Sequence, residues 1–119
     1  MFISIFDAVF ANLAKICLLM VVVKAVTKRV KWRTMDRYLM KIHRSLAHYL
    51  IIFGCVHGGL SCWQIWHVSM MSYVLGVVGL LAIIAAFMSF QMRAKMGGDW
   101  KKWHRIASII AIVLLILHV

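Results

Sequence analysis

Four of the six histidines form two pairs with the same spacing. Thirteen mostly apolar residues separate His43 from His57, and thirteen separate His104 from His118. In an α-helix this spacing amounts to about 3.9 turns and a rise of about 21 Å. The two histidines of each pair should therefore lie on nearly the same helix face, one near each side of a membrane.

Imidazole nitrogen is a common axial ligand of haem iron. Two such helices side by side would offer two stacked His–His pairs, His43 with His104 and His57 with His118, and each pair could hold one haem. Histidines within or beside hydrocarbon are costly and are usually functional. The alternative is that they hydrogen-bond between helices or lie at the membrane interface. Zinc is disfavoured because two ligands about 21 Å from the other two cannot share one ion.

The composition is that of a membrane protein. The chain has 119 residues, of which 65% are apolar, and it contains no proline. Its mean hydropathy is +0.94, whereas soluble domains are nearer half apolar. The net charge of +11 is gathered in two blocks beside apolar runs, which favours a role in membrane orientation over nucleic-acid binding. The sequence shows no phosphate-binding glycine loop, no CxxC pair and no Ser/His/Asp grouping.

The apolar runs predict four membrane-spanning helices in one transmembrane domain covering residues 1–119. Each run is near the ~20 residues that a bilayer requires. The expected fold is an all-α, integral membrane four-helix bundle with two stacked haems. The predicted spans are 3–26, 42–60, 69–92 and 103–119.

Charge predicts the orientation of these spans. The segments 27–41 and 91–102 are rich in Lys and Arg, whereas 61–68 contains neither. Cytoplasmic loops carry the excess of cations, so we expect both basic segments in the cytoplasm. The protein would then be a multi-pass protein of the cell (inner) membrane, with both termini on the outer side. Gly97-Gly98-Asp99 is typical of a turn followed by a helix start. With this topology His43 and His104 share the cytoplasmic depth, which is the pairing that the spacing predicts.

Three cationic residues are candidates for binding haem propionates. Arg44 and Arg105 each follow an inner-level histidine, and guanidinium groups bind carboxylates in bidentate fashion. Their alternative is to extend into the headgroup region at the cytoplasmic boundary. Lys15, in the outer half of the first span, could reach an outer propionate or extend outward.

The other two histidines are not expected to ligate. His48 is five residues from His43, which places it off the ligand face and predicts a polar contact between helices. We expect His67 to be a hydrated interface residue.

Glycines near the expected ligands would let a macrocycle or a helix approach closely. Those that meet this description are Gly54, Gly58 and Gly59. Gly76 and Gly79, on the third span, are expected to serve helix packing.

The pattern resembles the ferric reductase-like transmembrane family, which includes ferric reductases, NADPH oxidases and the haem-b membrane subunit of bacterial methionine sulfoxide reductase systems. The resemblance covers roughly residues 38–119. It depends on the segments Ile42-His43-Arg44 through His57-Gly58 and Trp103-His104-Arg105 through His118. It implies two b-type haems that pass electrons across the membrane, the cytoplasmic one on His43 and His104. The family usually has six helices, where this sequence predicts four, and this sequence carries no flavin or nicotinamide domain.

The predicted function is that of a dihaem b-type cytochrome, an electron-transfer oxidoreductase that requires a separate donor. The donor would be a flavoprotein or a quinol, and the acceptor would lie outside. Membrane lipid surrounds the chain, nucleic acid is not expected, and homo- or hetero-oligomers are both compatible with the sequence. The alternatives are a quinone-linked cytochrome b subunit of a larger complex, or a cofactor-free basic membrane protein such as an assembly factor or channel.

Overall fold

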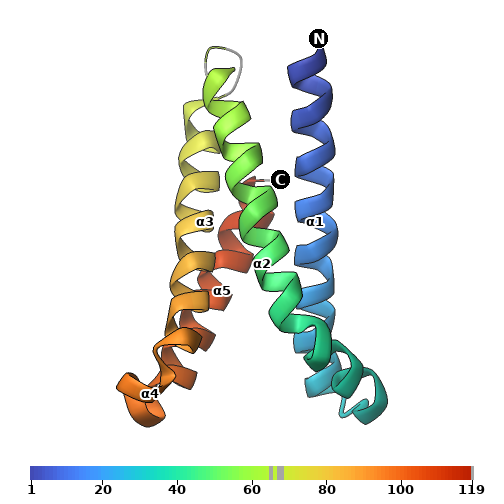
Figure 1. The fold of residues 1–119 in the computed structure, drawn as a ribbon, viewed down its shortest axis with the longest axis vertical. Helices are drawn as coiled ribbons and strands as arrows, with labels where there is room; N and C mark the ends of the chain where they lie inside the picture. The colour runs from blue at the N-terminus through green and yellow to red at the C-terminus, as the bar shows by residue number, and fades with distance from the viewer. Residues whose placement is uncertain (65, 67–68, 119) are drawn as a thin grey trace. The chain divides into compact units, whose positions relative to one another are not determined.

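The fold is described by a computed structural model that covers residues 1–64, 66 and 69–118. Within these residues the chain is 94% helical and has no strand, as the all-α prediction requires (Figure 1). The elements are α1 (Phe2–Arg29), α2 (Arg33–Trp63), α3 (Met70–Gln91), the short α4 (Arg93–Met96), the 3-10 helix η2 (Gly97–Asp99) and α5 (Trp100–His118).

The chain divides into two compact units, residues 1–60 and 61–119. The first contains α1 and nearly all of α2, and the second contains α3, α4, η2 and α5. Each unit is built on one pair of long helices. Each therefore brings a histidine-bearing helix against one partner helix.

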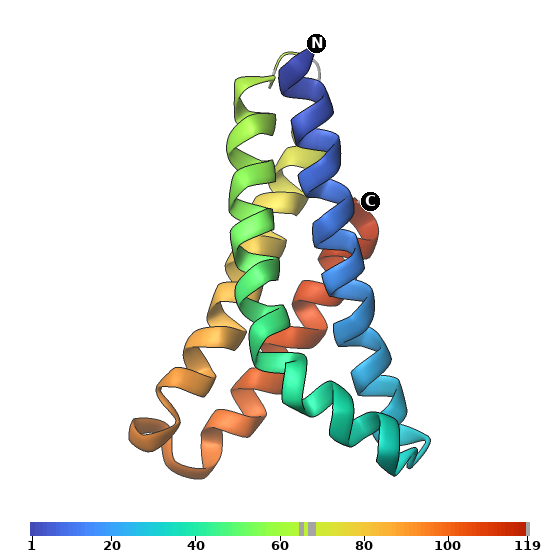
Figure 2. The ribbon, with the colours of Figure 1, turned by 45° about the vertical axis from the view of Figure 1, so that its right-hand side comes forward.

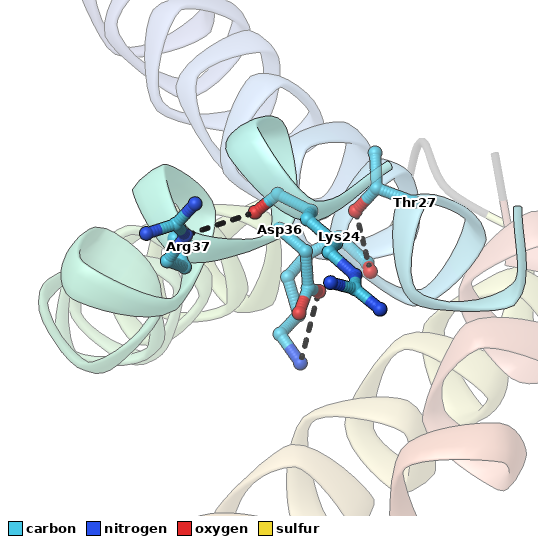
Figure 3. Close-up of polar contacts among 5 residues, drawn as sticks. Lys24, Thr27, Asp36 and Arg37 are labelled. Carbon is cyan, nitrogen blue, oxygen red and sulfur yellow. Dashed lines mark hydrogen bonds and ion pairs between the residues drawn. The ribbon is translucent and has the colours of Figure 1, made fainter. Parts of the chain in front are cut away.

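In the first unit, α1 and α2 run antiparallel. The rings of Phe10 and Phe53 lie 6.0 Å apart near the end distant from the turn. Close to the turn, Lys24 Nζ lies 3.9 Å from Asp36 Oδ1 (Figure 3). The buried Thr27 hydroxyl donates to the Lys24 carbonyl over 2.9 Å. The Phe10–Phe53 and Lys24–Asp36 contacts therefore join α1 to α2 near both ends of the pair, whereas the Thr27 hydrogen bond lies within α1.

The helix α2 begins at Arg33, nine residues before the expected start of the second span. The segment 27–41, which the apolar spans and the cations predict to be a cytoplasmic loop, is therefore mostly helical, and that prediction was wrong for most of its length. The reason is that the segment has no proline or glycine, and Lys, Arg, Leu and Met are good helix formers. Figure 2 shows this first part of α2 running at an angle to the rest of the helix.

In the second unit, α3 packs antiparallel against α5 through small residues. Gly79 faces Leu115, whose Cδ2 would lie 3.1 Å from a Cβ at that position. Ala86 and Ala111 are both buried. Small residues permit this close approach of two helices where lipid offers no hydrophobic drive between them. Gly79 thus serves packing, as expected.

The second basic segment is also largely helical, because α4, η2 and the first turn of α5 occupy it. The predicted turn at Gly97-Gly98-Asp99 is confirmed. Gly97 has a φ of 61°, a conformation that glycine adopts without steric cost, and α5 begins at Trp100, directly after Asp99. Gly97 therefore allows the chain to change direction between α3 and α5.

Among the described residues, α1, α2 and α3 are long and apolar enough to cross a membrane. Side chains of α1 such as Phe6, Ile16 and Leu19 are more than half exposed. Exposed apolar surface of this extent suits lipid and not water. The fourth expected span forms α5, which has cations at 101, 102 and 105 in its first two turns and is not one of these three candidates.

Candidate functional site

His57 contacts a carboxylate that lies 50 residues earlier in the chain. Its Nδ1 is 2.6 Å from Asp7 Oδ1, an interaction between α2 and α1. The two side chains are mostly buried, with 26% and 20% of their surfaces exposed. Asp7 is one of only three acidic residues in the chain. The sequence argument did not assign it this role.

His104 contacts the backbone of α3. Its Nδ1 lies 2.7 Å from the Ala86 carbonyl oxygen and 3.4 Å from Ser89 Oγ. The Ser89 hydroxyl itself donates to the Ala86 carbonyl over 2.7 Å. His104 is half-buried and lies in the first turns of α5. Its ring is thus oriented by an acceptor on the neighbouring helix.

His118 has an equivalent partner at the other end of the same two helices. Its Nδ1 lies 2.6 Å from the Ser72 carbonyl oxygen and 3.2 Å from Ser72 Oγ. The ring lies over Gly76: a Cβ on that glycine would be 2.8 Å from His118 Cε1. Gly76 was expected only to help helices pack, but its lack of a side chain also makes room for this imidazole.

One arrangement is common to His57, His104 and His118. Carbonyl and carboxylate oxygens only accept hydrogen bonds, so Nδ1 carries the proton in each case. In a neutral imidazole, Nε2 then holds the lone pair. Metal-ligating histidines usually donate their other N–H to a carboxylate or a backbone carbonyl in this way. When neutral, the three rings therefore have the tautomer and the restraint that ligation through Nε2 requires.

The remaining histidines of α2 differ in exposure. His43 is half-buried, whereas His48 is exposed. His48 Nδ1 lies 2.7 Å from the Arg44 carbonyl, one turn earlier in its own helix. This difference agrees with His43 lying on the packed face of α2 and His48 away from it. His67 lies outside the described residues.

The three cationic candidates are exposed. Arg44 lies on α2, Arg105 on α5 and Lys15 on α1. Their positions leave both roles open, contact with a propionate or with lipid headgroups. Asp7, which lies on the same helix as Lys15, contacts His57.

A second polar feature lies beside the turn between α1 and α2. It is a crevice of about 310 Å³ lined by Thr27, Lys28, Lys31, Arg33 and Asp36. It contains none of the histidines.

The four predicted ligands lie two in each unit, His43 and His57 on α2 and His104 and His118 on α5. The described residues contain no group of three or more His, Cys, Asp or Glu side chains that could hold a metal ion. A haem with two axial imidazoles needs only two such groups per iron. Comparisons with models of protein families, with curated proteins and with solved structures find no match to this chain.

Proposed function

We propose that this chain is a dihaem b-type membrane cytochrome that carries electrons across the membrane. The observation that carries the proposal is the shared restraint of His57, His104 and His118, each holding its Nδ1 proton on an oxygen acceptor. Histidines that lie at a membrane interface and bind no metal have no reason to share one tautomer. The equal spacing of the two histidine pairs supports the same reading.

In this proposal His43 and His104 hold the cytoplasmic haem, and His57 and His118 hold the outer one. The pairing comes from the spacing and from the orientation that the cations predict. Arg44, Arg105 and Lys15 are the candidate partners of the propionates. When bound, haem supplies one-electron redox chemistry at iron.

The contribution of the protein is to fix ligand orientation and to exclude water. The acceptors at Asp7, Ala86 and Ser72 hold three imidazoles in one tautomer, so little rearrangement is needed when a metal binds. In this proposal the apolar helices keep the four rings within the membrane, away from water. Donor and acceptor are separate molecules: a cytosolic flavoprotein or membrane quinol, and an outer-side oxidant.

Purified protein is expected to contain two noncovalent b-type haems per chain. The chain has no CxxCH motif for covalent attachment, so acid-acetone extraction should leave the polypeptide colourless. The measurement is a reduced-minus-oxidised spectrum with haem quantified per folded chain. Folded protein with one haem or none would contradict the proposal, and a colourless protein would favour the cofactor-free alternative.

The proposed orientation is tested separately. A single cysteine at Gln64, in a chain whose native cysteines are replaced by serine, should react with an impermeant thiol reagent added from outside intact cells. A cysteine at Met96, among the cations of the second basic segment, should react only after the membrane is opened. The reverse pattern would exchange the inner and outer haems.

A further inference from the structure

The acceptors of the three restrained histidines are chemically unequal. His104 and His118 donate to backbone carbonyls, at Ala86 and Ser72. His57 instead donates to the carboxylate of Asp7. A carboxylate is a stronger acceptor than a neutral carbonyl because it carries a full charge. The carboxylate acceptor therefore distinguishes His57 from the other proposed haem ligands.

The Asp7–His57 contact is held firmly by its surroundings. Phe10 lies three residues after Asp7 on α1, and Phe53 lies four residues before His57 on α2. Residues at these spacings share a helix face. The two phenyl rings lie 6.0 Å apart, which places an apolar contact one turn below the polar one. The carboxylate is thus largely removed from water, where its effect on the imidazole is strongest.

We infer that Asp7 is a positioning residue that lowers the reduction potential of the haem held by His57. The inference depends on the proposed function. A proton shared strongly with a carboxylate makes the imidazole more basic. A more basic ligand donates more electron density to iron and stabilises the ferric state more than the ferrous state, and hydrogen bonding around the ligands is an established determinant of potential.

The test is a redox titration of the purified full chain and its Asp7→Asn variant, followed in the haem absorption bands. Asparagine keeps the size and the accepting oxygen but removes the charge. The expected result is an upward shift of one of the two midpoint potentials, with the other unchanged and haem content retained. Asp7→Glu, which restores a carboxylate, should move the shifted potential back toward the wild-type value.

A matched control separates the contact from a general effect of charge. Asp36→Asn makes the same chemical change at the other end of the α1–α2 pair, where Asp36 contacts Lys24. It should leave the potential that responds to Asp7 unchanged. The ferric low-spin electron paramagnetic resonance signal adds a second readout, because Asp7→Asn should shift the g values of one haem only.

The outcomes are distinguishable. Two haems at wild-type content with both potentials unmoved in Asp7→Asn would overturn the inference and leave the proposed function standing. Loss of fold in both Asp7→Asn and Asp7→Glu would assign Asp7 a structural role and also overturn it. Loss of one haem from folded Asp7→Asn, restored in Asp7→Glu, would show that Asp7 determines haem affinity and not the potential, and would also overturn it. Wild-type protein without haem would overturn the proposed function and this inference together.

Discussion

Replacement of His118 by alanine is expected to lower the haem content from about two to about one per folded chain, because each haem would depend on its own pair of imidazoles. His57→Ala should remove the same haem. His43→Ala and His104→Ala should remove the other. The two classes of variant should differ in which absorption and redox component is lost.

His48→Ala is the control for these variants. It removes an exposed imidazole from the same helix as His43 and His57, so both haems should remain. Haem is measured per folded chain, since a bound cofactor stabilises the native state and its loss also lowers protein yield. Loss of a haem in His48→Ala, with none lost in His43→Ala, would show that the ligand register on α2 is misassigned.

The helices could be predicted from the sequence to the extent that they are apolar. Long apolar runs indicated α1 and α3, and the Gly97-Gly98-Asp99 turn indicated where α5 begins. The start of α2 could not be found in this way, because hydropathy marks the part suited to lipid and not the end of the helix. Arg33 continues a segment free of helix breakers, so the helix extends beyond its apolar part.

Only the features of the candidate site that depend on spacing within one helix could be predicted from the sequence. The fourteen-residue steps from His43 to His57 and from His104 to His118 can be read from the sequence alone, because they depend on the helix period. The partners Asp7 and Gly76 could not be identified, since they are set by the register of one helix on another. Asp7 and His57 are 50 residues apart, and no local pattern joins them. One clue was present: an isolated Asp in an apolar span usually has a partner.

Gly76→Ala is expected to weaken binding of the haem held by His118 by about 10- to 100-fold, the range for lost support of a metal ligand. The new methyl group would lie 2.8 Å from His118 Cε1 and 3.1 Å from Nδ1. The imidazole must move, and its bond to the Ser72 carbonyl moves with it. The imidazole is the far end of a side chain, so the helices themselves need shift little. Haem retention during dilution or gel filtration measures the effect.

Gly79→Ala is the matched control, since it places the same methyl group one turn along the same face of α3. There the new Cβ would meet Leu115 at 3.1 Å, an apolar neighbour with no role in ligation. Helix packing should adjust while both haems are retained. Equal haem loss in the two variants would mean that close packing of α3 on α5, and not the position of His118, determines binding.

The packing of α5 on α3 also bears on how the chain enters the membrane during synthesis. With cations at 101, 102 and 105, α5 gains less from lipid than the other long helices do. The contacts of α5 along α3, from Ala86 to Ser72, compensate for the lower apolarity of α5. Because α3 is made first and is long and apolar enough to cross a membrane, we expect α5 to insert against it. Correct placement of the two histidines of α5 in the membrane then depends on α3, a helix that contributes none of the proposed haem ligands.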